Sequence, residues 1–446
     1  MKKFYAREKE QAAILSELQL VKETGSARMA VITGRRRVGK TQLILKTLRG
    51  RDEPLVYLFA ARMTREALVR AWVKEAAEKL GIAFPPRLER LSEVILWLLS
   101  LSRSRTFCVA IDECQDIDPA EPSFWSELQR DWDLSRESSR MLLLMSGSVA
   151  SAMRRIFSDM SEPLYGRVNS FITVRPFGIR TLREILSDYS GKPEPESLLA
   201  LYALTGGVPW FVEDLADHGA TDLERMAERA FCPSSIFLTD GDILIATEFK
   251  AEAVTARTIL AGLASGVTKR EELQNLVPGT SISGALSKLE KFFGLITPSA
   301  PIFEANYRKA RYALSDCYLK FWFLFVEKEA FAREMQDYGG MRERFLAGYP
   351  AYSGRVLEQL FDALFKEERR YSRVGHWWDR KGENEIDLIG IDDRNKTVDI
   401  FEIKRNPKKI SLELLQKKAD AFLSQNAGQL KGYEPRLRGL SLEDLA

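Results

Sequence analysis

Two glycines, a lysine and a threonine stand at fixed spacing in the segment that begins at Gly34. Residues 34–41 read Gly-Arg-Arg-Arg-Val-Gly-Lys-Thr, which fits the Gly-x-x-x-x-Gly-Lys-Thr pattern of a phosphate-binding loop. Glycine lets the backbone turn its N–H groups toward an anion, and the positive end of the following helix faces the same anion. We expect Lys40 to reach the β- and γ-phosphates of a nucleoside triphosphate and the Thr41 hydroxyl to ligate Mg²⁺.

The context of this loop supports the prediction. An apolar strand precedes the loop, and a helix-like segment, residues 42–46, follows it. A turn rich in glycine and lysine can match the pattern by chance, but chance does not also supply the strand and the helix. The predicted nucleotide contacts in the loop are Gly34, Arg35, Arg36, Arg37, Val38, Gly39, Lys40, Thr41 and Gln42.

An acidic pair follows a second apolar run. Residues 107–111 read Phe-Cys-Val-Ala-Ile and lead into Asp112 and Glu113. Such a run is typical of a buried strand, and open α/β sheets bind ligands at the carboxyl ends of their strands. We expect Asp112 to lie in the Mg²⁺ shell and Glu113 to orient and deprotonate the attacking water. Either carboxylate alone would also fit an ordinary acidic turn.

A third set of charged residues lies in the C-terminal part of the chain. Asp387 stands in one predicted strand, while Glu402 and Lys404 stand two residues apart on the same face of a later strand. A hairpin would bring the three together, and Glu358 on a preceding helix would complete the set. Carboxylates that hold Mg²⁺ or Mn²⁺, beside a lysine that steadies charge, suit phosphodiester hydrolysis. We predict metal ligands at Glu358, Asp387 and Glu402 and catalytic roles for Asp387, Glu402 and Lys404.

Other interpretations of this C-terminal set stay open. Glu383 and Glu385 are weaker alternatives for the acidic positions. The basic stretch 404–409 follows at once, and it could grip phosphate groups. Alternating charges on a hairpin also fit an ordinary solvated face of a sheet.

The elements that would position these residues are strands alternating with helices. This alternation predicts parallel crossovers and a doubly wound α/β sheet in residues 1–180, followed by a helical lid in residues 181–248. The expected strands are 29–33, 55–59, 107–111, 141–145 and 171–174, and the expected helices between them are 40–48, 64–80, 91–101 and 123–133.

The pattern changes between residues 249 and 330. Helices are predicted at 255–263, 269–276 and 281–293, followed by strands near 294–298 and 311–314. This order describes a winged helix–turn–helix, which reads DNA or serves as a protein–protein spacer. The third helix carries Lys288 and Lys291 but also Glu290, so its basic character is modest. Residues 331–446 form the last predicted domain, with a helix at 352–370 and strands at 374–379, 385–391 and 398–403.

Composition limits the class of protein. The chain has 446 residues, 45% of them hydrophobic and 29% charged, with a net charge of +3. These values predict a multidomain globular protein and do not by themselves indicate nucleic acid as a partner. Four scattered cysteines without a Cys-x-x-Cys pair fit a reducing cytoplasm and give no zinc signature. We see no signal peptide, and the apolar run 318–326 is too short to span a bilayer.

Five motifs carry a family resemblance in the N-terminal part of the chain. Beside the phosphate loop, they are Phe-Tyr-Ala-Arg-Glu-Lys-Glu at 4–10, Asp-Glu-Cys-Gln at 112–115, Leu-Met-Ser-Gly-Ser at 144–148, Pro-Leu-Tyr-Gly-Arg at 163–167 and Gly-Gly-Val-Pro at 206–209. The sequence resembles the archaeal-type ATPases, a branch of the AAA+/STAND P-loop class. The resemblance implies ATP and Mg²⁺ as cofactors and further nucleotide contacts.

The implied contacts have distinct roles. Arg7 would pack near the adenine, and Ser146 or Ser148 would sense the γ-phosphate. The turn that ends at Pro209 would join the helical lid to the nucleotide. Arg167 would act as an arginine finger on the phosphate, within the chain or from a neighbouring copy.

The C-terminal part resembles the restriction-endonuclease-like PD-(D/E)XK superfamily. Glu358, Asp387, Glu402 and Lys404 are the matching positions, and Ile386 replaces the proline of the motif. The resemblance implies an α/β nuclease-like fold with Mg²⁺ or Mn²⁺.

We therefore expect a cytoplasmic, Mg²⁺-dependent ATPase that switches a DNA-directed, nuclease-like domain, without a membrane partner. One alternative is a regulatory or scaffold ATPase whose winged helix and inactive nuclease-like domain only bind DNA or protein. Another is a regulator whose winged helix reads DNA sequence. Assembly into a homo-oligomer or with a protein partner is compatible with each hypothesis.

Overall fold

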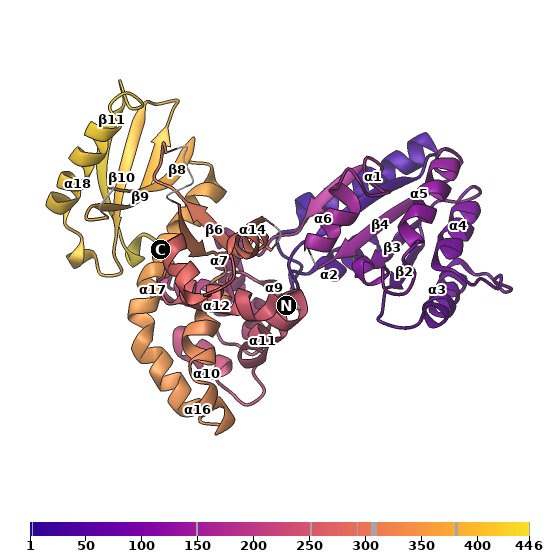
Figure 1. Ribbon diagram of the computed structural model, residues 1–446, viewed down its shortest axis with the longest axis horizontal. Helices are drawn as coiled ribbons and strands as arrows, with labels where there is room; N and C mark the ends of the chain where they lie inside the picture. The colour runs from indigo at the N-terminus through magenta and orange to yellow at the C-terminus, as the bar shows by residue number, and fades with distance from the viewer. Residues whose placement is uncertain are drawn as a thin grey trace. The chain divides into compact units, whose positions relative to one another are not determined.

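The computed structural model describes residues 1, 3–148, 150–249, 252–291, 293–304, 310–379 and 382–445 (Figure 1). Its contacts divide the chain into two compact units. The N-terminal unit is Ala6–Arg175, and the C-terminal unit combines Met1–Tyr5 with Pro176–Ala446. Each unit is described by itself below.

The N-terminal unit is built on a parallel five-stranded sheet in the order β2-β3-β4-β1-β5. Strands β3 and β4 are buried along their whole length. Parallel strands covered on both faces read as continuous apolar runs, which is why the sequence predicts them well. The strands are β1 (Arg28–Thr33), β2 (Leu55–Phe59), β3 (Phe107–Asp112), β4 (Met141–Gly147) and β5 (Ser170–Thr173).

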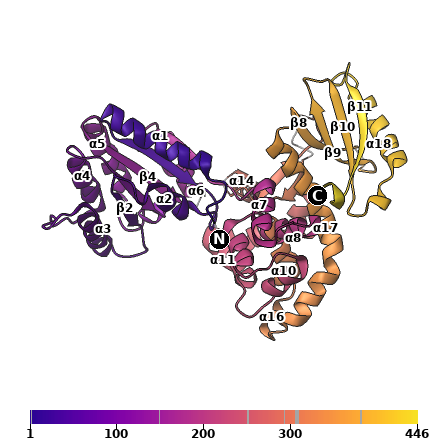
Figure 2. The ribbon, with the colours of Figure 1, turned by 180° about the vertical axis from the view of Figure 1, so that it is seen from behind.

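Helices cover both faces of this sheet (Figures 1 and 2). Helices α3, α4, α5 and α6 build one core with Met29 and Val31 of β1. Neighbouring residues of a strand point to opposite faces, and α1 and α2 pack on the other face. The helices are α1 (Glu8–Thr24), α2 (Lys40–Leu48), α3 (Arg65–Leu80), α4 (Leu91–Leu101), α5 (Phe124–Ser135) and α6 (Ala150–Ser158).

The sequence predicts four of these helices and misses α1 and α6. Helix α3 begins one residue after the expected Thr64, because the Thr64 hydroxyl accepts a hydrogen bond from the Ala67 N–H and caps the helix. Helix α5 is shifted toward the C-terminus relative to the expected 123–133. The sheet itself has the doubly wound, parallel character that the sequence predicts.

The C-terminal unit begins with a helical layer. Three helices, α12, α13 and α14, then precede an antiparallel pair of short strands, β6 and β7. Residues 305–309, which lie between the two strands in sequence, are outside the described residues. The elements are α7 (Ile179–Ser190), α8 (Pro195–Thr205), α9 (Pro209–Asp217), α10 (Leu223–Ala230), α11 (Ile236–Phe249), α12 (Ala253–Ala264), α13 (Arg270–Leu276), α14 (Ser283–Lys291), β6 (Ile296–Ser299) and β7 (Arg311–Leu314).

Strands β8 to β11 form a mixed sheet at the end of the chain. Its order is β11-β10-β9-β8, with β10 and β11 parallel and the other pairs antiparallel. Helix α18 packs on β9, β10 and β11, and α17 contacts β8 and β9 (Figure 1). The elements after β7 are α15 (Cys317–Trp322), α16 (Ala330–Glu334), α17 (Tyr338–Glu368), β8 (Arg373–Trp378), β9 (Glu385–Asp392), β10 (Thr397–Ile403), α18 (Leu412–Gln425) and β11 (Glu434–Leu440).

Two of these results differ from the sequence-based expectation. Helix α17 begins well before residue 352 and continues through Pro350, while α18 and β11 are not predicted at all. Within the ranges that the structure describes, no helix combines the length and apolarity needed to cross a bilayer.

Candidate functional site

The phosphate-loop pattern joins β1 to α2 at the carboxyl edge of the parallel sheet. Gly39, at φ 93°, caps the N-terminus of α2 in a conformation that favours glycine. A Cβ at Gly34 would lie 2.4 Å from the carbonyl oxygen of Val174, so the backbone passes too close for any larger residue. Lys40 is buried, and its Nζ donates to the carbonyl oxygens of Gly34 at 3.0 Å and Arg35 at 3.2 Å. The lysine therefore lies across the loop that its own sequence motif forms.

Four donors converge on the carboxylate of Asp112, which is only 2% exposed. Its Oδ2 accepts from the Thr41 hydroxyl at 2.6 Å and from the Tyr57 hydroxyl. Its Oδ1 accepts from the Ser146 hydroxyl at 2.8 Å and from the backbone N–H of Glu113 at 3.0 Å. Buried carboxylates need such partners, so α2, β2 and β4 together fix Asp112 beside the phosphate loop.

Glu113 has a hydrogen-bonded environment of its own. Its backbone is left-handed, at φ 53°, which turns the side chain away from the strand direction of β3. Its Oε2 accepts from the Ser148 hydroxyl at 2.8 Å and from the Gln115 amide at 2.5 Å. The sequence left open whether Ser146 or Ser148 acts at the site. In the structure each serine holds one member of the acidic pair, Asp112 or Glu113.

Arg7 lies against the phosphate loop within the N-terminal unit. It is buried, and its guanidinium donates to the carbonyl oxygen of Val38 at 3.1 Å and to Glu10 at 3.3 Å. Burial lowers the pKa of Arg7, and the carboxylate of Glu10 partly offsets that effect. Of the other predicted loop contacts, Arg36 and Gln42 are exposed and Arg35 and Arg37 are half-buried.

Arg167 and Pro209 occupy different positions. Arg167 forms an ion pair with Asp133 at 2.8 Å, and it also donates to the carbonyl oxygens of Pro163 at 2.9 Å and Tyr165 at 3.0 Å. Pro209 is the first residue of α9 in the C-terminal unit. The roles of Arg167 as a finger and of Pro209 at the nucleotide stay predictions.

The bonds of Arg167 lead to a testable expectation. A guanidinium that is tied to a carboxylate and two carbonyls within its own unit supports local structure. Arg167→Ala is therefore expected to leave ATP turnover nearly unchanged, whereas loss of an arginine finger costs about 10³-fold or more. Steady-state ATP hydrolysis measures this, with Arg130→Ala as the control, since exposed Arg130 pairs with Asp131. A collapse of turnover in Arg167→Ala alone would support the finger role.

The C-terminal unit brings Asp387, Glu402 and Lys404 together, as the predicted hairpin requires. Lys404 Nζ lies 2.9 Å from Asp387 Oδ2 and 3.7 Å from Glu402 Oε1. Asp387 Oδ2 also accepts from the Ile403 N–H at 2.8 Å, and Glu402 Oε2 accepts from the Ser411 N–H, at the start of α18, at 2.9 Å. The ammonium group therefore stands beside two acids whose positions the backbone fixes.

A β-bulge places Asp387 at this site. One residue of β8, His376, faces two residues of β9, Asp387 and Leu388. His376 Nδ1 lies 2.6 Å from the carbonyl oxygen of Asp387. Bulges bend a strand and re-aim its side chains, and they often stand next to active sites. The sequence does not reveal this bulge.

Glu358 joins the cluster electrostatically from α17. Burial, and then the charge of Asp387, raises the pKa of the Glu358 carboxyl to about 8. Burial by itself lowers the pKa of Lys404. The hydrogen bond and charge of Asp387, followed by the charges of Glu402 and Glu358, outweigh burial and raise that pKa. Sequence reasoning missed Lys320 of α15, which also favours the charge on Glu358 and donates to Gln359 at 3.1 Å.

The other charged residues that the sequence suggests for this region lie outside the cluster. Glu383 is exposed, and Glu385 is exposed and paired with Arg311 at 3.1 Å. In the basic stretch 404–409, Arg405 pairs with Glu196 at 2.6 Å, so it supports the fold rather than a ligand. Among the residues that the structure describes, no three His, Cys, Asp or Glu side chains form a ready metal cage.

Comparison with known proteins identifies the N-terminal part of the chain. Residues 4–215 match a protein family described as an ATPase domain predominantly from Archaea. The chain contains a P-loop ATPase domain. Residues 322–418 match a second family, described as archaeal and bacterial proteins of unknown function. The uncharacterized protein MJECL04 of Methanocaldococcus jannaschii is 27% identical over 430 residues, which cover 93% of this chain and 91% of that protein.

Two solved structures share the fold of the P-loop ATPase domain. The Walker-type ATPase PABY2304 of Pyrococcus abyssi has a TM-score of 0.54 and 20% identity, covering 72% of this chain and 96% of that chain. The ORC2 protein of Aeropyrum pernix, solved as ADPNP–ADP complexes, has a TM-score of 0.51 and 14% identity, covering 78% and 96%. At these identities the likeness concerns the fold alone.

One residue of the ATPase domain escaped prediction altogether. Tyr57 lies on β2, next to β3, and its hydroxyl reaches Asp112 across the strands. Burial, and then the hydrogen bond to Asp112, raises the pKa of Tyr57, so the phenol keeps its proton and can donate. A tyrosine within the apolar run 55–59 is the only sequence signal for this contact.

Proposed function

We propose that the chain is a Mg²⁺-dependent ATP hydrolase whose ATPase domain acts as a nucleotide switch for a nuclease-like, DNA-directed C-terminal region. The observation that carries the ATPase part is the set of bonds around Asp112. A phosphate-loop threonine and the acid that ends β3 share a hydrogen bond of 2.6 Å, next to a buried lysine. The P-loop family match supports ATP as the nucleotide.

In this proposal the residues of the site divide the work. Lys40 and the loop N–H groups hold the β- and γ-phosphates, and Arg7 fixes the loop through Val38. Thr41 and Asp112 would hold Mg²⁺, which supplies neutralisation of phosphate charge when it is bound. Glu113 orients the attacking water and accepts its proton.

The donor set suits Mg²⁺. Hydroxyl and carboxylate oxygens are its preferred protein ligands. Ser146 and the Glu113 N–H donate to Oδ1 of Asp112, whereas its Oδ2 accepts from Thr41 of the loop and from Tyr57. The held carboxylate costs no reorganisation when charge develops on the phosphate, which is how preorganised sites lower a barrier.

The C-terminal proposal rests on topology and on one cluster. The order α17–β8–β9–β10–α18–β11, with a parallel last pair, supports the resemblance to the restriction-endonuclease-like fold. Glu358, Asp387 and Glu402 provide the oxygen donors that Mg²⁺ or Mn²⁺ prefers. Lys404 would steady charge on the phosphodiester or orient the attacking water.

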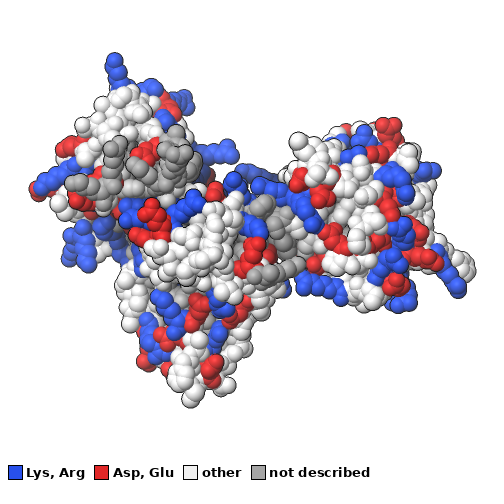
Figure 3. Space-filling model, viewed as in Figure 1, with Lys and Arg blue, Asp and Glu red and all other residues white. Residues whose placement is uncertain are grey.

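The winged helix in this proposal is the region from α12 to β7. Three helices and an antiparallel hairpin support that assignment. Lys288 of α14 is paired with Glu252, which neutralises one of its two lysines, while Lys291 is exposed. The visible face of the molecule likewise intersperses cationic and anionic residues (Figure 3). We therefore assign this region to transmission within the protein rather than to sequence reading.

A cleavage assay tests the nuclease part. Plasmid and linear DNA are incubated with wild type, Asp387→Ala and Lys40→Ala, with Mg²⁺ or Mn²⁺, and with or without ATP. We expect Asp387→Ala to lose cleavage and Lys40→Ala to change its ATP dependence. Asp420→Ala, an exposed aspartate on α18, is the matched control. Equal cleavage by wild type and Asp387→Ala would show that the proposed site is wrong.

A second candidate function has an observation in its favour. Lys404 Nζ contacts both Asp387 and Glu402, so a cation must compete with an ammonium group already among the acids. That arrangement also suits an inactive nuclease-like domain in a regulatory or scaffold ATPase. Absence of cleavage under every condition, with DNA retained at low salt, would favour this function over the first.

A further inference from the structure

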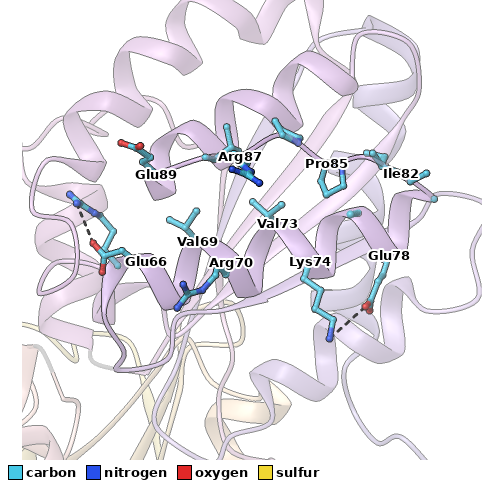
Figure 4. Close-up of a pocket in the computed structure, with 16 residues that line it drawn as sticks. Glu66, Val69, Arg70, Val73, Lys74, Glu78, Ile82, Pro85, Arg87 and Glu89 are labelled. Atoms are coloured by element: carbon cyan, nitrogen blue, oxygen red, sulfur yellow. Dashed lines mark hydrogen bonds and ion pairs between the residues drawn. The ribbon is translucent and has the colours of Figure 1, made fainter.

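A groove lies along α3 in the ATPase domain, and its lining contains none of the phosphate-loop residues or the acidic pair. Its volume is about 980 Å³, and it lies between α3 and the segment 81–89. Val69 and Val73 of α3 face Ile82 and Pro85 of that segment (Figure 4). Charged side chains from both walls surround this apolar floor. The groove is therefore a distinct surface feature of the domain.

The segment that forms one wall of the groove also carries an exposed aromatic side chain. Phe84 is 93% exposed, and it does not line the groove. The segment is held at both ends: Gly81 caps α3 in the left-handed region, and Arg90 is the N-cap residue of α4. Two prolines follow Phe84 directly and restrict the backbone. Burying this side chain against an apolar surface would be favourable, and the restrained segment holds it ready for such a contact.

The charges at the groove are of mixed sign. On α3, Arg65 pairs with Glu66 at 3.3 Å, and Lys74 approaches Glu78 at 3.8 Å (Figure 4). The remaining charges of the lining are Arg70 on α3 and Arg87 and Glu89 on the segment. The lining carries one more cation than anions, and both signs are present, so Arg70 of one copy can approach Glu89 of the other.

We propose that two copies of this chain associate through this surface, with Phe84 of each copy inserted into the groove of the other. The occupant is a second copy because the aromatic plug and the apolar groove belong to one stretch of chain. A two-fold contact then satisfies both with no other molecule. The contact is small, so the association is weak and reversible and depends on protein concentration.

Sedimentation across a concentration series tests this proposal with the full chain, in the absence of nucleotide. The wild type is expected to shift from monomer toward dimer. Phe84→Ser removes both plugs of the symmetric contact, so it should weaken association by roughly tenfold or more. Leu134→Ser is the matched control, because Leu134 is also exposed, at 78%, on α5 of the same unit. Equal association by the wild type and Phe84→Ser, or a monomer throughout, would overturn the proposal.

A thiol crosslink tests the geometry itself. Cys108, Cys114 and Cys317 are buried, and Cys232 is half-buried. The Cys232→Ser background therefore leaves only buried native thiols. A mixture of Ala83→Cys and Val73→Cys chains, which keeps Phe84 in both, should form a dimer with a short bismaleimide. A mixture of Leu134→Cys and Val73→Cys chains should not. If the first mixture does not crosslink more than the second, the proposed insertion is excluded. The same result is expected if a different protein occupies the groove.

Discussion

Lys40→Ala is expected to lower ATP turnover by about 10²-fold or more, the cost of losing one preorganised charge at a developing phosphate charge. Lys40 is buried, and its ammonium group lies 3.0 Å from the carbonyl oxygen of Gly34. It therefore stands over the loop that we propose receives the phosphates, with little freedom to be replaced by water. Release of inorganic phosphate at saturating ATP and Mg²⁺ measures the effect.

The control separates chemistry from folding. Lys46→Ala removes a lysine from the exposed face of the same helix, α2, and should leave turnover unchanged. Glu113→Gln provides a second arm, since it keeps the bond from Ser148 possible while removing the base. We expect Glu113→Gln to bind ATP with little loss and to hydrolyse it slowly. Turnover retained in Lys40→Ala would contradict the ATPase assignment of this site.

The structure explains why the sheet of the ATPase domain is predictable from sequence. Strands β3 and β4 are buried on both faces, so each reads as an unbroken apolar run whose end is marked by a polar residue. The phosphate loop depends on residues that are neighbours in sequence, and Gly39 meets a local backbone demand at φ 93°. Gly34 differs, because the close approach of Val174, far away in sequence, excludes a side chain there. Constraints between residues that are close in sequence can therefore be predicted from the sequence.

Contacts between distant elements leave no such signal. Tyr57 reaches Asp112 from another strand, and Ser148 reaches Glu113 from the end of β4. Neither pairing follows from spacing, because each depends on strand order and register. Arg405 shows the opposite error: its basic neighbours predict a phosphate contact, whereas Glu196, far away in sequence, binds it at 2.6 Å.

The C-terminal cluster of Asp387, Glu402, Lys404 and Glu358 is predictable from the sequence only in part. Asp387 and Lys404 belong to adjacent antiparallel strands or their ends, so a hairpin in the sequence already predicts their proximity. The bulge at Asp387 and the docking of α17, which carries Glu358, depend on packing that a short pattern does not encode. The sequence also gives little signal for β11, which is mostly exposed and has little apolar periodicity.

Glu358→Gln is expected to stabilise the C-terminal unit at pH 8 and above and to leave its stability unchanged near pH 4. Burial and Asp387 raise the pKa of Glu358 from its ordinary 4.5 to about 8, so the folded state holds this proton more tightly than the unfolded state. Stability is then full below pH 4.5 and falls as pH rises toward 8. The difference above pH 8 is on the order of 3–5 kcal/mol, because each tenfold change in proton affinity between the two states is worth about 1.4 kcal/mol.

The difference between wild type and variant reports Glu358 and its interactions with nearby charges, because groups that do not interact with Glu358 contribute equally to both proteins. Calorimetric melting from pH 4 to pH 9 in EDTA measures it, with Glu343→Gln as the control, an exposed glutamate on the same helix. Parallel pH profiles for wild type and Glu358→Gln would contradict the prediction. Excess Mn²⁺ adds a further test, since a cation held by Glu358 and Asp387 would stabilise the wild type and reverse the advantage of the variant. If Mn²⁺ leaves the advantage in place, the carboxylates serve a binding domain rather than a metal-dependent nuclease.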